Sequence, residues 1–70
     1  MSETLHVQLN GETRRLEPGA TITALLEAER LAERRVAVEV NGEIVPRGRH
    51  AEHALRDGDK IEIVHALGGG

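Results

Sequence analysis

The chain has 70 residues, a formal net charge of −3, and neither cysteine nor any aromatic residue. This length allows one small domain with an aliphatic core and leaves no room for a deep catalytic pocket. The acidic balance and the lack of aromatic stacking platforms disfavour nucleic acid as a partner, and the lack of cysteine excludes disulfides, thiolate metal sites and a persulfide on this chain. No apolar run is long enough to span a bilayer and no signal-peptide pattern is present, so we expect a cytoplasmic protein with no membrane partner.

Alternating apolar residues over 4–9 predict a half-buried strand, and the Asn10-Gly11 pair after it is the strongest short signal for a hairpin turn. Residues 12–16 would be the returning strand. In the register of a two-residue hairpin, Val7 would face Arg14. This mismatch favours an edge strand with a bulge after the turn that shifts its register.

A helix is predicted after the strand-breaking sequence Glu17-Pro18-Gly19. Thr21 is suited to cap its first turn, and apolar residues recur with helical spacing over 22–26. We expect the helix to run to about Arg30, since no glycine or proline ends it earlier. Residues 31–35 would then be either a last helical turn or a loop.

The second half of the chain repeats the hairpin signal and ends in a further strand. The predicted elements are a strand at 36–40, a turn at Asn41-Gly42, a short strand at 43–45, a helical turn at 51–55, a tight turn at 57–59 and a fifth strand at 60–66.

This order of elements favours an α+β fold. A hairpin, a helix, a second hairpin and a last strand fit a β-grasp, or ubiquitin-like, roll, in which a mixed sheet of about five strands carries one main helix on one face. We expect residues 1–66 to form this single domain and residues 67–70 to be a flexible glycine-rich tail. A small SH3-like barrel is the alternative, but it leaves the amphipathic helix without a place to pack.

The C-terminal sequence Leu67-Gly68-Gly69-Gly70 has two interpretations. Glycines add nothing to a core and lose the most backbone entropy on ordering, so the run can be a frayed end. It can also be an arm that threads a narrow channel in a partner, because it has no bulky side chain. Such an arm would present the unhindered carboxylate of Gly70.

Histidines and arginine pairs are further candidates. His50 and His53 are spaced to share a helical face, but a metal site would need a third ligand from His65 or a carboxylate. We therefore interpret the histidines as solvated surface residues and expect no metal. Arg47 and Arg49 form a basic spot that is either ordinary solvated charge or a docking contact for an acidic partner. The other basic pairs are Arg14-Arg15 and Arg34-Arg35.

The sequence carries no catalytic constellation that we can identify. It has neither a nucleophile elbow nor a P-loop. Asp57 and Asp59 are better explained as turn residues whose carboxylates accept hydrogen bonds from nearby backbone N–H groups. We expect no catalytic residue in this chain, which is then not an enzyme.

Three segments resemble the ThiS family, the sulfur carrier proteins that serve the synthesis of the thiazole of thiamine. They are Val36–Arg47 (VAVEVNGEIVPR), Leu55–Ile63 (LRDGDKIEI) and His65–Gly70 (HALGGG). The resemblance covers essentially the whole chain. Its specific part is the Asp-Gly-Asp turn, the strand that follows it and the terminal glycines.

The resemblance implies a β-grasp carrier that acts as a co-substrate. An E1-like adenylyltransferase of the ThiF type would adenylate Gly70 with ATP and Mg²⁺, and a persulfide from a cysteine desulfurase would supply sulfur. The resulting C-terminal thiocarboxylate would pass its sulfur to a thiazole synthase of the ThiG type. Gly68 and Gly69 would present the tail. No cofactor would be bound permanently, apart from the transient acyl-AMP and thiocarboxylate on Gly70.

For partner docking, we expect an apolar patch on the face of the fifth strand around Ile63, together with Leu67. Three alternatives to the thiamine carrier stay open at this point. They are the small subunit of molybdopterin synthase, a ubiquitin-like modifier of lysines, and an interaction module with a frayed tail.

Overall fold

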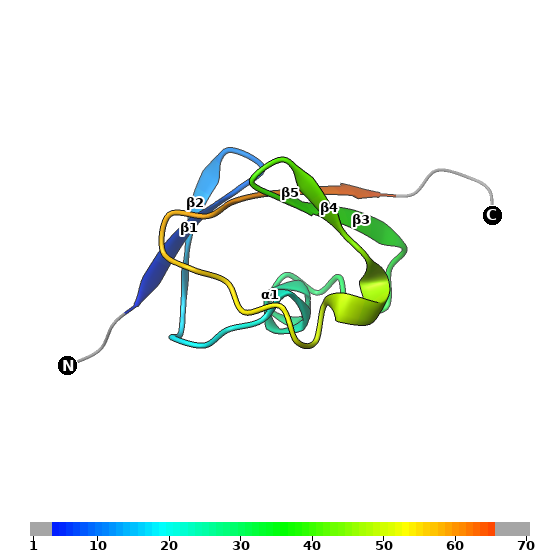
Figure 1. Cartoon of the computed structure of the whole chain (residues 1–70), viewed down its shortest axis with the longest axis horizontal. Helices are drawn as coiled ribbons and strands as arrows, with labels where there is room; N and C mark the ends of the chain where they lie inside the picture. Colours follow the sequence, from blue (N-terminus) through cyan, green and yellow to red (C-terminus); the bar gives the residue numbers. More distant parts are fainter. Residues whose placement is uncertain (1–3, 66–70) are drawn as a thin grey trace.

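A five-stranded mixed sheet with one helix against one of its faces makes up residues 4–65, the part of the chain that this computed structural model describes (Figure 1). The elements are β1 (Leu5–Leu9), β2 (Glu12–Leu16), α1 (Ile22–Ala28), β3 (Val36–Val40), β4 (Glu43–Val45), the 3₁₀ helix η1 (Arg47–Arg49) and β5 (Lys60–His65). The strands lie in the order β2-β1-β5-β3-β4, with β5 parallel to β1 and antiparallel to β3. This is the β-grasp roll that the order of elements predicted, with β5 between the two hairpins.

The core lies between α1 and the inner face of the sheet, and its apolar side chains are all aliphatic. Burying each of them is worth about 1.5–3 kcal/mol, so the core decides which side of every strand faces the helix. The buried apolar residues are Val7, Leu9, Ile22, Leu25, Leu26, Val38, Val40, Val45, Leu55, Ile61 and Ile63.

The first hairpin keeps the direct register, so the expected bulge is wrong. Val7 pairs with Arg14, and β2 is the expected edge strand. Asn10 (φ 50°) and Gly11 (φ 86°) both adopt left-handed values, which a two-residue turn requires and which fix this register. Arg14 is accommodated on the inner face because its guanidinium reaches Glu29 beyond the end of α1, with Nε 3.0 Å from a carboxylate oxygen. Hydrogen bonds to Glu29 and then to Glu12 raise the pKa of Arg14 above its ordinary value.

Helix α1 begins as predicted and ends earlier than predicted. The Thr21 hydroxyl accepts a hydrogen bond from the amide of Ala24 at 3.1 Å, which confirms the N-cap. The last helical residue is Ala28, not Arg30, because Arg30 adopts φ 63°. The amides of Arg30 and Leu31 donate to the carbonyls of Glu27 (3.1 Å) and Leu26 (2.7 Å), which together form a Schellman motif with arginine at the position that glycine usually holds.

The segment between β4 and β5 lacks the helical turn expected at 51–55. Its only helix within the described residues is η1 at Arg47–Arg49. The backbone farther on is committed to α1 instead. The amides of Glu52 and His53 close a turn on the carbonyl of Arg49, and the carbonyls of His50 and His53 accept hydrogen bonds from the amides of Thr23 (3.2 Å) and Ile22 (3.1 Å). The segment therefore caps the start of α1 and does not continue as a helix.

Candidate functional site

Strand β5 leads directly into the C-terminal sequence and is held on both sides. It pairs with β3 from Val40↔Ile61 to Val36↔His65 and with β1 at its beginning. Because β5 is parallel to β1, it ends at the side of the sheet opposite to the start of β1 (Figure 1). The predicted tail, Leu67 and Gly68–Gly70, lies outside the described residues, so its roles stay predictions.

The structure corrects the expected docking patch at Ile63. Its side chain is only 7% exposed and belongs to the core. The reason is the alternation along β5, which turns Ile61 and Ile63 toward α1 and Val64 to the other face. Ile63 therefore stabilises the fold and offers no side-chain surface to a partner.

The large apolar side chains that are exposed within the described residues lie on the outer face of the sheet instead. Val64 is 59% exposed on β5, and Ile44 is 61% exposed on β4. Val64 pairs with the exposed Ala37 of β3, and Ile44 pairs with Glu39 in the next row. We call Ala37, Ile44 and Val64 the outer patch. Strand alternation in the sequence places Val64 on the face opposite to Ile63 and Ile44 on the face opposite to Val45, but the packing against α1 decides which of the two faces is exposed.

Two carboxylates border the outer patch. Glu39 and Glu62 pair across β3 and β5, and both side chains share the outer face with Ile44. Glu62 is exposed and Glu39 is half-buried. A partner that covers this face would therefore meet an apolar surface with an acidic border, which favours aliphatic and basic side chains on its own side.

His50 is buried, not solvated as its polar sequence context predicts. It is 5% exposed, and its Nε2–H donates to the carbonyl of Val45 at 2.9 Å. This bond ties η1 to the end of β4. Within residues 4–65 no group of three or more histidine, cysteine, aspartate or glutamate side chains is arranged to hold a metal ion.

The Asp57-Gly58-Asp59 sequence forms the expected turn, and its carboxylates are occupied by the fold. Asp57 accepts a hydrogen bond from the amide of His6 at 2.8 Å. Asp59 accepts from the amide of Arg56 at 2.8 Å and from the side-chain amide of Asn41 at 2.9 Å. The two aspartates therefore close the loop before β5 and are not an acid–base pair.

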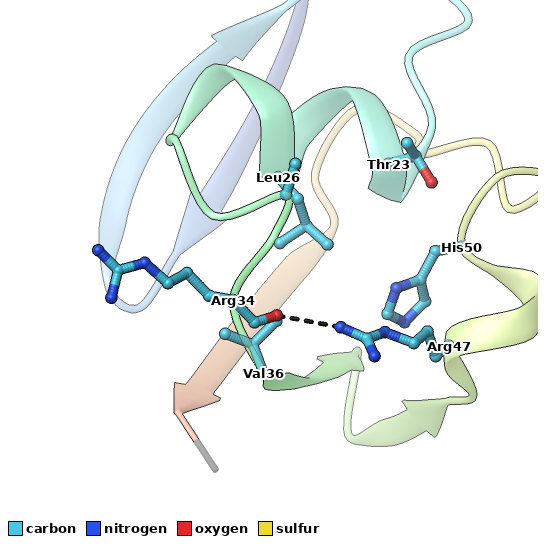
Figure 2. A pocket seen from close by; sticks show the side chains of 7 residues that line it. Thr23, Leu26, Arg34, Val36, Arg47 and His50 are labelled. Carbon is cyan, nitrogen blue, oxygen red and sulfur yellow. Dashed lines mark hydrogen bonds between the residues drawn. The ribbon is translucent and has the colours of Figure 1, made fainter.

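A cavity of about 150 Å³ lies at the end of the sheet where β5 ends, and Arg34, Arg47 and His50 are among the residues that line it. Figure 2 shows the Arg47 side chain beside the ring of His50, with its guanidinium donating to the carbonyl of Arg34. The two atoms are 3.1 Å apart. Leu26 and Val36 supply apolar walls. The sequence indicates Arg47 as a docking candidate, but no pattern in it places Arg47 next to Arg34.

No helix among the described residues is long and apolar enough to cross a membrane.

Comparisons with known proteins agree with the β-grasp fold. The model of the ThiS family matches residues 7–70. The chain is 43% identical over 65 residues to the sulfur carrier protein ThiS of Bacillus subtilis, an alignment that covers 91% of this chain and 98% of that protein. The crystal structure of the thiamine biosynthesis protein ThiS from Geobacter metallireducens superimposes with a TM-score of 0.81 at 30% identity, covering 94% of this chain and 100% of that one.

The chain is also similar to part of a larger protein. It is 48% identical over 62 residues to a thiazole synthase of Paramagnetospirillum magneticum, an alignment that covers 89% of this chain and 19% of the synthase. The chain thus spans about a fifth of the length of the thiazole synthases it matches.

Proposed function

The chain belongs to the ThiS family, and we propose that it is a sulfur carrier of thiamine biosynthesis, a co-substrate of other enzymes in the cytoplasm rather than a catalyst. The observation that carries the proposal is the family match over residues 7–70, which includes the terminal Gly68-Gly69-Gly70. The fold supports it, because the strand that leads into these glycines is paired on both sides.

The proposed chemistry takes place on the carboxylate of Gly70. A carboxylate resists nucleophiles because oxide is a poor leaving group, so an E1-like adenylyltransferase of the ThiF type first joins it to AMP, using ATP and Mg²⁺ and releasing pyrophosphate. The terminal sulfur of a persulfide, supplied through a cysteine desulfurase, then attacks the acyl carbon and AMP leaves. A second thiol attacks the resulting acyl disulfide, which gives the Gly70 thiocarboxylate and a disulfide on the donor.

This chain contributes presentation and docking to those steps. We propose that the outer patch receives the adenylyltransferase, since Val64 lies six residues before Gly70, a reach of about 20 Å at most in extended chain. Glu39 and Glu62 at its border would meet basic side chains of that enzyme. We propose that Leu67 extends the docking surface toward the tail. Gly68 and Gly69 would pass through the narrow channel that leads into the active site of the adenylyltransferase.

The acceptor of the sulfur is a thiazole synthase of the ThiG type. The support is the similarity of this chain to part of thiazole synthases, at 48% and 41% identity. A carrier-like segment joined to a synthase indicates that the two act on one another. The named relatives of this chain also favour thiamine synthesis over the molybdopterin synthase and lysine modifier alternatives.

The proposal is tested by intact mass. The purified chain is incubated with the adenylyltransferase, ATP, Mg²⁺, cysteine desulfurase, cysteine and a thiol. We expect the mass gain of one sulfur-for-oxygen exchange at the C-terminus, and no gain for a chain that lacks Gly69 and Gly70. A thiamine requirement after deletion of the gene is the matching observation in cells. An unchanged mass together with thiamine-independent growth would overturn the proposal.

A further inference from the structure

Four exposed arginines lie in two segments that meet at the end of the sheet where β5 ends, where Arg47 donates to the carbonyl of Arg34. They are Arg34 and Arg35 before β3, and Arg47 and Arg49 in η1. We call these four residues the arginine end. Val36 pairs with His65, the last described residue of β5, so the arginine end borders the point where the C-terminal sequence begins. Within residues 4–65, no ion pair joins any of the four guanidinium groups to a carboxylate, although the chain carries a net charge of −3.

Arg34 and Arg47 of the arginine end line the cavity described above (Figure 2). A cavity of about 150 Å³ accommodates a benzene-sized group, so this one fits a single aliphatic side chain against Leu26 and Val36. Its shape is fixed by the fold. His50 donates to the Val45 carbonyl, and its own carbonyl accepts from the amide of Thr23, which holds η1 between β4 and α1. Arg47 is therefore presented from an anchored element.

A free anion fits this surface poorly. The amides at the start of α1, which would otherwise attract an anion, already donate to the carbonyls of His53 and His50 and to the Thr21 hydroxyl. Figure 2 also shows the Arg34 side chain directed away from Arg47 and His50, so the two guanidinium groups do not converge on one small ion. Separated cations beside an apolar cavity match a protein surface better, because each can pair with its own carboxylate.

Chain length requires every enzyme that acts on Gly70 to come close to the arginine end, and the charge of the two surfaces then decides which partner each one fits. Five residues follow His65, and an extended chain of that length reaches about 18 Å at most. An enzyme that holds the Gly70 thiocarboxylate in its active site must therefore bring the entrance of that site close to the arginine end. The outer patch lies on the sheet face away from α1 and is bordered by Glu39 and Glu62. It therefore suits a partner with basic side chains, whereas the arginine end suits one with acidic side chains.

We propose that the arginine end and its cavity are the docking surface for the thiazole synthase. The synthase would present, at the entrance that admits the tail, an aliphatic side chain flanked by carboxylates. The aliphatic side chain fills the cavity, and the carboxylates pair with Arg47 and its neighbours. This inference rests on the proposed function, which supplies the synthase as the partner. It leaves the outer patch for the adenylyltransferase, so the carrier recognises its two enzymes by different surfaces.

The test is the affinity of the full-length chain for purified thiazole synthase, measured by calorimetry at low and high salt. Arg47→Glu replaces one positive charge by a negative one, and Ala32→Leu, at the wall of the cavity, fills the space. Arg15→Glu is the matched control, because it makes the same change of charge at an exposed position on β2, the far edge of the sheet. We expect Arg47→Glu and Ala32→Leu to raise the Kd about tenfold or more, and Arg15→Glu to change it less than twofold.

Several outcomes decide between the proposals. Unchanged affinity in both test variants, or an equal loss in Arg15→Glu, overturns the docking surface. Competition by inorganic phosphate that Arg47→Glu abolishes would assign an anion site instead and also overturns it. A wild-type chain that does not bind the synthase at all contradicts the proposed partner itself. Urea unfolding is measured for every variant, and Arg49→Glu replaces Arg47→Glu if that variant does not fold.

Discussion

The side-chain amide of Asn10 forms a double hydrogen bond with the backbone of Ile63. Its Oδ1 accepts from the Ile63 amide at 2.8 Å, and its Nδ2 donates to the Ile63 carbonyl at 3.2 Å. The backbone pairing of β1 with β5 covers only Gln8↔Lys60 and Leu9↔Ile61, after which β1 turns away. Asn10 thus continues the ladder by one step with its side chain and closes β5 on the side of β1.

Replacing Asn10 by glycine should isolate this contribution. Glycine tolerates the left-handed backbone of the turn, so the main loss is the hydrogen-bonded pair with Ile63. Each such bond contributes about 1 kcal/mol, and we expect the free energy of unfolding to fall by about 1–2 kcal/mol in urea. Asn10→Asp keeps the acceptor and loses the donor, so its free energy of unfolding should lie between those of the wild type and Asn10→Gly. Gln8→Ala, at an exposed neighbouring position, is the control. A stability equal to that of the wild type would show that water replaces the pair at no cost.

Arg30→Gly should stabilise the protein. Arg30 holds φ 63° at the end of α1, where a side chain is strained and glycine is not. We expect a gain of about 1 kcal/mol in the free energy of unfolding, with unchanged docking to either enzyme. Glu27→Gly, inside the helix, is the paired control and should cost about 1 kcal/mol. A loss of stability in Arg30→Gly would mean that the arginine side chain makes a stabilising contact that outweighs the strain.

The sequence predicted those elements whose signals are local. Both Asn-Gly turns, the Thr21 cap and the strand at 43–45 depend on residues within a few positions of one another, and each was located correctly. The end of the helix was not located correctly, because Arg30 adopts the left-handed conformation and no glycine marks that position in the sequence. The prediction of a bulge was wrong because Arg14 donates a hydrogen bond to Glu29, fifteen positions away in the sequence. This tertiary contact lets an arginine occupy the inner face without a shift of register.

The candidate site was predicted less well for the same reason. Whether Ile63 or Val64 faces a partner depends on a one-residue parity that only the packing of β5 against α1 decides. His50 looks like a surface histidine in a polar loop until η1 places it against Val45. The terminal glycines, in contrast, are recognised directly in the sequence, because the family match over residues 7–70 depends on no tertiary contact.

Val64→Asp should weaken activation without unfolding the domain. Val64 is 59% exposed, so the free energy of unfolding should change by less than about 1 kcal/mol. A charge at the centre of an apolar contact should slow acyl-adenylate formation about tenfold or more, measured as ATP–pyrophosphate exchange with the adenylyltransferase. Thr13→Asp, on the outer face of β2, is the control of equal charge. Native exchange rates for Val64→Asp would remove the outer patch from the docking model.

Ile63→Ala should lower stability and leave activation unchanged, the reverse of what we expect for Val64→Asp. This buried side chain packs in the core, so truncation should cost about 2–5 kcal/mol of stability. The variant molecules that stay folded should be activated at the native rate, because Ile63 presents no side-chain surface. Slow activation at unchanged stability would restore Ile63 as a docking residue.

Appending one alanine after Gly70 tests the position of the reacting carboxylate. An extended chain advances about 3.3–3.6 Å per residue, so the carboxylate would move by that distance from its place beside the α-phosphate of ATP. A misplacement of only 1 Å can cost about 10²-fold in rate, and we therefore expect pyrophosphate exchange to be nearly eliminated. Stability and docking should be unchanged, since the added residue follows the predicted tail. One alanine before Met1 is the matched control and should be harmless. If the C-terminally extended chain is activated at the native rate, and mass spectrometry detects no trimming, then Gly70 is not the acyl site and the carrier function proposed here fails.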